Sequence, residues 1–156
     1  MLNGMEKNSF TYITAYGVPD ESILDHLIEL YATLFEDADI YFFKKRIIEH
    51  PDLISILAYN KEELIGFKIG YSYNNDTFYS WIGGVKRSFR QKGIATILAE
   101  NQELIVKQKG YLKLRTKSMN RFKPMMVLNL KNGFDIIQIY TNKIGQTKII
   151  FEKRLD

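Results

Sequence analysis

Residues 81–95 read Trp81-Ile-Gly-Gly-Val-Lys-Arg-Ser-Phe-Arg-Gln-Lys-Gly-Ile-Ala95. The stretch passes from an apolar, strand-like segment through a short basic connector into a segment whose apolar residues have helical spacing. Gly93 and Ala95 keep the first helical turn free of bulky side chains. The first amides of a helix lack intrahelical acceptors and lie at the positive end of its dipole, so such a turn binds anions, commonly phosphate. The stretch therefore predicts a site for a phosphorylated ligand at the helix start near Gly93.

The segments on either side predict a mixed sheet covered by helices. Aromatic and β-branched runs bounded by turn residues predict strands, and apolar residues at helical spacing predict helices. Strands are expected over 10–16, 53–59, 64–73, 77–85, 111–116, 134–140 and 148–153, and helices over 20–34, 41–49, 93–108 and 122–130. This order predicts an α/β (or α+β) fold: a mixed, mainly antiparallel twisted sheet of about seven strands flanked by about four helices.

Composition narrows the class of protein. The 156 residues, 46% of them hydrophobic and 13% aromatic, indicate one folded domain over 1–156 with its core at about 9–155. Without cysteine, disulfides and thiolate sites are excluded. His26 and His50 have no ligand spacing around them, so no metal site is predicted. No signal segment or membrane-length apolar run is present, which favours a cytoplasmic protein that does not bind membranes. A net charge of +4 fits an anionic cofactor but is too small to predict nucleic-acid binding.

The central stretch resembles motif A of the GCN5-related N-acetyltransferases, the GNAT family. That motif reads Arg/Gln-x-x-Gly-x-Gly/Ala, and here Arg90, Gly93 and Ala95 match it, with Val85 at the position of the apolar residue that ends the fourth strand. The later segment Asn129-Leu-Lys-Asn-Gly133-Phe134 is similar to the family's segment before the sixth strand, which usually ends in Gly-Phe. The predicted order of elements agrees with the family over almost the whole chain, which implies the acyl-CoA N-acyltransferase fold.

The resemblance implies acetyl-CoA as co-substrate. The amides from Arg90 to Ala95 would bind the pyrophosphate, with Arg90 and Lys92 adding positive charge at the rim. Gly83-Gly84 within a strand marks a bulge or a close backbone approach. In the family, free backbone groups there hold the pantetheine, with the Val85 amide nearest the thioester carbonyl. The implied cofactor-binding residues are Gly84, Val85, Arg90, Gln91, Lys92, Gly93, Ile94, Ala95 and Asn129.

Two positions depart from the common family pattern. Where some members carry a glutamate base on the fourth strand this chain has Tyr79, and the strand 77–85 contains no carboxylate. A water chain organised by Tyr79 or Ser80, or an acid from elsewhere, is the base expected here, although Tyr79 could simply pack. Asn129 replaces a tyrosine that can protonate the thiolate, so it is expected to line the cofactor rather than act as the acid. Tyr140 or water could take that role.

The expected activity is acetyl transfer from acetyl-CoA to a primary amine of a small molecule, peptide or protein, directly within a ternary complex. The acidic and aromatic segment 35–42 suits an amine cation, although an ordinary exposed loop would look the same. One alternative is an acyl-CoA-binding module of the same fold with little or no turnover. Another is a basic interaction protein whose glycine turn is purely structural. The last hairpin, 134–153, offers an edge at which a homodimer could form.

Overall fold

The computed structural model describes residues 9–156, so residues 1–8 of the predicted domain lie outside the described part. The described residues divide into two compact units. The first contains residues 9–71 and 82–102, and the second contains residues 72–81 and 103–156. Strand β4 (Thr77–Val85) runs from the second unit into the first. The strand order is β1-β2-β3-β4-β5-β7-β6, the mixed seven-stranded sheet that the sequence predicts.

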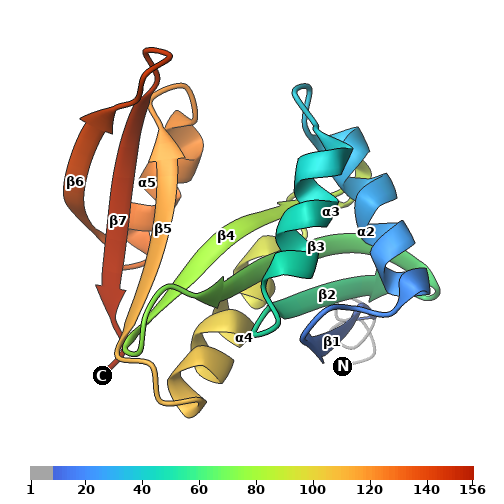
Figure 1. The fold of residues 1–156 in the computed structure, drawn as a ribbon. Helices are drawn as coiled ribbons and strands as arrows, with labels where there is room; N and C mark the ends of the chain where they lie inside the picture. Colours follow the sequence, from blue (N-terminus) through green and yellow to red (C-terminus); the bar gives the residue numbers. More distant parts are fainter. Residues whose placement is uncertain (1–8) are drawn as a thin grey trace. The chain divides into compact units, whose positions relative to one another are not determined.

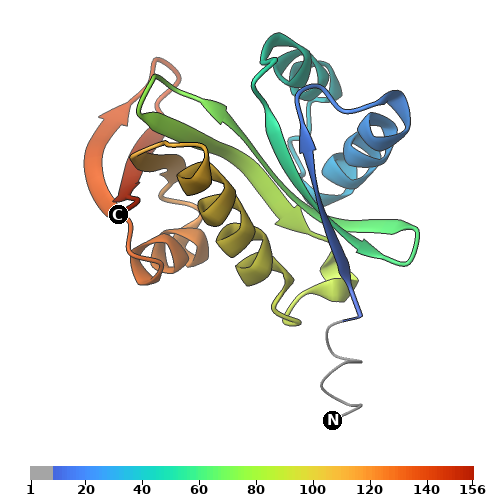
Figure 2. The same ribbon diagram turned by 90° about the horizontal axis from the view of Figure 1, so that it is seen from below.

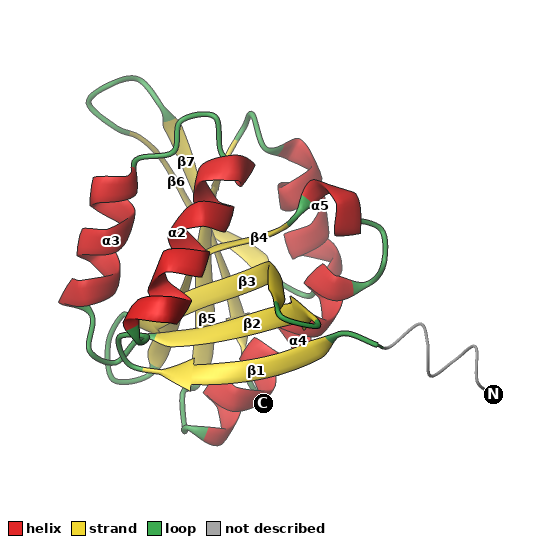
Figure 3. Cartoon of the chain, turned by 90° about the vertical axis from the view of Figure 1, so that its right-hand side faces the viewer, coloured by secondary structure: helices red, strands yellow, loops and turns green. Residues whose placement is uncertain are grey.

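The first unit is an antiparallel sheet with helices on both faces. Its strands are β1 (Thr11–Tyr16), β2 (Ile54–Asn60), β3 (Glu63–Ser72) and the end of β4. Its helices are α2 (Glu21–Leu34), α3 (Ile40–Glu49), the short 3-10 helix η1 (Arg87–Phe89) and the part of α4 (Ile94–Gln108) that ends at Gln102. Figure 3 shows β1, β2 and β3 side by side, with α2 and α3 in front of them.

Adjacent residues of β3 show which helices cover each face of this sheet. Phe67 packs against Phe43 of α3, with ring centroids 6.3 Å apart. Its neighbour Gly66 points the other way: a Cβ built on it would lie 3.3 Å from Ile94 and 3.4 Å from Leu98 of α4. α4 therefore covers the face opposite α2 and α3 (Figure 2).

The second unit is a smaller sheet with one helix of its own. The start of β4 pairs in parallel with β5 (Lys113–Met119) over Thr77–Ser80. β7 (Thr147–Arg154) lies antiparallel between β5 and the edge strand β6 (Asp135–Thr141), as Figure 1 shows. Helix α5 (Lys123–Lys131) contacts β5. Buried Leu114, Ile149 and Phe151 form the apolar centre of the unit.

Every predicted strand and helix is present, and the differences are local. Asp20 caps α2 by accepting a 2.9 Å hydrogen bond from the Ile23 amide. β5 begins at Lys113 rather than at Tyr111, because the Tyr111 amide donates to the Val106 carbonyl oxygen, at 3.3 Å, at the end of α4. Leu104 of α4 is exposed, whereas Gln102 is buried, so the buried stripe of α4 is not the one that hydrophobicity alone suggests. No helix within residues 9–156 is long and apolar enough to cross a membrane.

Candidate active site

The glycine pair near the end of β4 permits two close approaches in the first unit. A Cβ on Gly83 would lie 3.0 Å from the main-chain oxygen of Phe67, and a Cβ on Gly84 would lie 2.7 Å from Cδ1 of Leu34. A side chain at Gly83 would press on the main chain of the neighbouring strand β3, whereas one at Gly84 would displace the end of the Leu34 side chain on α2. The predicted close backbone approach at this pair is confirmed, and the groups that approach belong to the protein itself.

The connector between β4 and α4 has an unusual backbone. After η1, Gln91 and Gly93 have positive φ angles of 62° and 80°. The Arg90 Nε donates a 3.1 Å hydrogen bond to the carbonyl oxygen of Val85, the last residue of β4. Since positive φ is unusual for a residue other than glycine, the conformation of Gln91 indicates a tightly specified turn. The turn ends directly at the first amides of α4.

These amides are available to a ligand. Among the described residues, no group accepts a hydrogen bond from the main-chain N–H of Ile94, Ala95 or Thr96. No described heavy atom lies within 4 Å of a Cβ built on Gly93, apart from its chain neighbours. The start of α4 is thus open and has unused donors, as a site for a pyrophosphate requires.

Cationic side chains surround this opening. A depression of about 420 Å³ in the first unit is lined by Thr33, Leu34, Lys86, Arg87, Ser88 and Arg90. Lys86 pairs with Glu63, whereas the connector also presents exposed Arg87 and Lys92. Three of the residues that line the depression are cationic, and its lining includes the connector but not the first residues of α4. The predicted residues from Gly84 to Ala95 all lie in this unit, on the end of β4, the connector and the start of α4.

Tyr79 and Ser80, the predicted organisers of a water chain, lie in the second unit. As neighbours on a strand they project to opposite faces of the sheet. Ser80 is buried, and its carbonyl accepts a 3.0 Å hydrogen bond from the Thr116 hydroxyl. Tyr79 is only partly buried, and the Lys117 ammonium lies 5.8 Å from the centre of its ring. Of the two, Tyr79 is the one with access to solvent.

Asn129 is the buried residue of α5, and its amide is unsatisfied. Its Nδ2 has no hydrogen-bond partner among the described residues, and the same holds for the buried Ser118 hydroxyl on β5. An unpaired buried donor costs about 1–3 kcal/mol. The Asn129 Nδ2 therefore remains a donor without an acceptor among the described residues.

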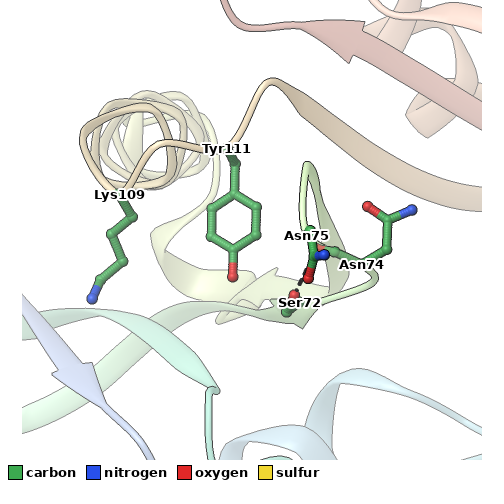
Figure 4. Close-up of a pocket in the computed structure, with 5 residues that line it drawn as sticks. All are labelled: Ser72, Asn74, Asn75, Lys109 and Tyr111. Atoms are coloured by element: carbon green, nitrogen blue, oxygen red, sulfur yellow. Dashed lines mark hydrogen bonds between the residues drawn. The ribbon is translucent and has the colours of Figure 1, made fainter.

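A second depression, of about 470 Å³, lies in the second unit and is lined by Ser72, Asn74, Asn75, Lys109 and Tyr111. In Figure 4 the Ser72 hydroxyl donates to the main-chain oxygen of Asn74, at 2.9 Å, within the turn that precedes β4. It contains none of the predicted site residues.

Sequence reasoning missed two residues that contact predicted ones and one further unpaired donor. Leu34 contacts Gly84, Ser118 is a second orphaned donor, and Lys117 lies against Tyr79. Of these, only Lys117 could have been identified from the sequence, because Lys113, Arg115 and Lys117 alternate along one strand and so share a face. The other two depend on contacts between distant segments.

The comparisons with known proteins agree with this geometry. The model of the Acetyltransferase (GNAT) family matches residues 21–123. A GNAT family acetyltransferase from Elizabethkingia anophelis, solved with acetyl-CoA bound, is 20% identical, with 95% of this chain and 99% of that chain covered and a TM-score of 0.75. Ard1 from Thermoplasma volcanium is 14% identical, with 95% and 99% covered and a TM-score of 0.77. No curated protein matches the sequence at a significant level.

A third solved structure, Arabidopsis thaliana NAA60 in complex with acetyl-CoA, is 18% identical, with 93% of this chain and 99% of that chain covered and a TM-score of 0.72. At these identities the solved structures establish the fold. The chain belongs to the GNAT acetyltransferase family, as its resemblance to motif A predicts. It is accordingly an N-acetyltransferase in the general sense, and acetyl-CoA is its co-substrate.

Proposed function

We propose that this enzyme transfers the acetyl group of acetyl-CoA directly to a primary amine, within a ternary complex. The absence of cysteine removes the usual nucleophile of a covalent acetyl-enzyme route. We also propose that the two units make up one N-acetyltransferase domain, because the family match at 21–123 includes parts of both. The same proposal places the enzyme in the cytoplasm, acting without nucleic acid or membrane.

The unused amides of Ile94, Ala95 and Thr96 are the observation that carries the proposal. In this assignment they bind the coenzyme A pyrophosphate together with Gln91 and Gly93, and Arg90 and Lys92 neutralise its charge. Gly84 and the Val85 amide serve the pantetheine and the thioester carbonyl. Bound acetyl-CoA supplies the activated acetyl group.

Proton transfer must differ from that of family members with a glutamate on the fourth strand. An alkylamine has a pKa near ~10.4 and must lose a proton before it attacks the thioester. We assign Tyr79 to order the water that accepts this proton, since Ser80 is buried and projects to the opposite face of β4. Asn129, which cannot act as an acid of tyrosine-like strength, is assigned to hydrogen-bond coenzyme A through its unpaired Nδ2. Positioning and amide donors can supply much of the rate without a strong acid.

Calorimetric titration with coenzyme A tests the amide site, and two glycines of the same helix make a matched pair. Gly93 precedes α4 and Gly110 follows it; both have positive φ, and a Cβ built on either has no described atom within 4 Å beyond its chain neighbours. Glutamate at either position therefore introduces similar backbone strain. Gly93→Glu should weaken binding at least tenfold, whereas Gly110→Glu should not change it. Equal affinities in the two variants would refute the amide site.

Turnover is tested by offering acetyl-CoA with a broad panel of amines and measuring released thiol. The protein has no cysteine, so every thiol detected comes from coenzyme A. Amine-dependent thiol release that Gly93→Glu abolishes supports the transferase. Tight coenzyme A binding with no release for any amine would instead support the acyl-CoA-binding module, the alternative that the departures at Tyr79 and Asn129 leave open.

A further inference from the structure

One face of the sheet in the second unit is rich in cations. Side chains at alternate positions of a strand share a face, so Lys113, Arg115 and Lys117 of β5 project together. Residues directly opposite on an antiparallel neighbour share that face too. They are Arg154 opposite Lys113, Glu152 opposite Arg115, Ile150 opposite Lys117 and Lys148 opposite Met119. We call this surface the cationic face.

The carboxylates of the cationic face are too few for its cations. Glu152 accepts from Arg115 at 2.6 Å and lies 3.9 Å from the Lys113 ammonium. Asp135, opposite Glu152 on β6, adds a second carboxylate at the same end of the face. Within residues 9–156, no carboxylate pairs with Lys117 or Lys148. The hydrogen bond of the Lys148 ammonium goes to the Met119 sulfur, at 3.3 Å, and a thioether is a weak acceptor.

Lys117 is held by two aromatic rings. Its ammonium lies 5.8 Å from the ring centre of Tyr79 on β4 and 6.0 Å from that of Tyr140 on β6. Both tyrosines are partly buried, whereas Lys117 is exposed. Cation–π attraction to the two rings favours this position of the ammonium. An ammonium beside phenol groups that can donate hydrogen bonds suits a carboxylate or a phosphate.

We propose that the cationic face binds an anionic group of the acetyl acceptor, so that the substrate is an amine carrying a carboxylate or a phosphate. The inference rests on the proposed acetyl transfer, because Tyr79 occupies the strand position at which some family members carry the base. Lys117 recognises this anionic group and so determines specificity. Lys148 attracts the same group at longer range. Lys117 and Lys148, which pair with no carboxylate in the described residues, can neutralise one or two anionic groups of a substrate. A nucleic-acid backbone would require several more phosphate contacts for useful affinity.

The test compares acceptors that differ only in charge. Each amine active in the thiol assay is offered as its carboxylate, its phosphate and its neutral carboxamide, and kcat/KM is measured. Wild-type enzyme should favour an anionic form over the carboxamide by at least tenfold, and the better anion identifies the natural group. Lys117→Gln should remove most of this preference and Lys117→Glu should reverse it. Lys131→Gln, an equal charge change at an exposed site on α5, should leave the preference intact. Equal kcat/KM for all three forms in wild-type enzyme would overturn the inference.

A binding measurement separates this inference from the proposed transfer reaction. Inorganic phosphate is titrated calorimetrically into protein saturated with coenzyme A, so that the start of α4 is already occupied. Binding that Lys117→Gln weakens severalfold and Lys131→Gln does not would support the cationic face even if no amine were acetylated. Binding that Lys117→Gln leaves unchanged would refute the site. Circular dichroism melts confirm that the variants are folded.

Discussion

Arg90 donates a hydrogen bond from its Nε to the carbonyl oxygen of Val85, at 3.1 Å, and so ties the connector back to the last residue of β4. The bond uses one donor of the guanidinium and leaves the terminal nitrogens free for a ligand. One residue thus helps to fix the turn and supplies charge at the start of α4. Because Arg90 has both roles, replacing it by lysine and replacing it by glutamine should weaken ligand binding to different extents.

Arg90→Lys should weaken coenzyme A binding severalfold, because the charge remains but the planar donor that fixes the connector is lost. Arg90→Gln should weaken it more, since the charge is lost as well. Hydrogen bonds to charged groups contribute about 1.5–3 kcal/mol, which sets the scale expected for the glutamine variant. Calorimetry of both variants makes the comparison. Identical losses would show that the bond to Val85 does not contribute to the site.

Alanine should be tolerated less well at Gly83 than at Gly84, although the contact at Gly84 is shorter. The new Cβ at Gly83 meets the main-chain oxygen of Phe67, which cannot move without distorting β3. At Gly84 it meets the end of the Leu34 side chain, which can rotate. Overpacking typically costs about 1–3 kcal/mol. Urea unfolding should place Gly83→Ala toward the upper end of that range, and Leu34→Ala should show favourable coupling with Gly84→Ala in a double-mutant cycle.

Burial lowers the pKa of Lys68, on β3, from 10.5 to about 8. Between pH 8 and 10.5 the unfolded chain binds more protons at this lysine than the folded protein does, so Lys68 makes stability rise with pH through that window. Below pH 8 the buried charge is a constant cost. Lys68→Met should therefore raise the unfolding free energy at pH 7 by on the order of 1–3 kcal/mol and flatten its rise between pH 8 and 9.5.

Urea unfolding at pH 7 and pH 9.5 measures both effects of the Lys68 substitution. The matched control is Lys44→Met, which removes the same charge from an exposed position on α3. It should retain the wild-type dependence on pH. A Lys68→Met protein with the wild-type slope would show that the lysine titrates normally in the folded state.

Asn129→Leu should make the protein more stable and weaken its binding of coenzyme A. The Asn129 Nδ2 is buried without a partner, so an apolar side chain of similar size removes a cost of about 1–3 kcal/mol. If the amide serves coenzyme A, the same variant should bind it more weakly. Thermal unfolding and calorimetry on one preparation measure both quantities. A variant that is more stable and binds coenzyme A normally would assign Asn129 no role in the site.

The edge strand β6 is expected to pair with β6 of a second copy. Apolar Ile137 and Ile139 are 47% and 61% exposed on a strand that has a neighbour on one side only. An antiparallel pairing centred on Gln138 would place Ile137 against Ile139 of the other copy. Sedimentation should therefore show a dimer that Ile139→Glu dissociates. A wild-type monomer at every concentration would contradict this pairing.

The sequence by itself determined the secondary structure and the position of the open helix start at Gly93, because both depend on local features. Periodicity and turn residues identified the strands and α-helices of residues 9–156, though not the short helix η1, and Gly93 marked the open helix start within a few residues. Local signals are sufficient there, because backbone conformation and free amides are properties of one segment.

Only the tertiary structure decided what the glycine pair is for and which polar residues are buried. Leu34 meets Gly84 across 50 residues of chain, and polar Gln102 is buried whereas apolar Leu104 is exposed. The unpaired state of Lys117 likewise depends on where Glu152 and the two tyrosines lie. Such facts are not local, because burial and ion pairing depend on which distant segments the fold brings together.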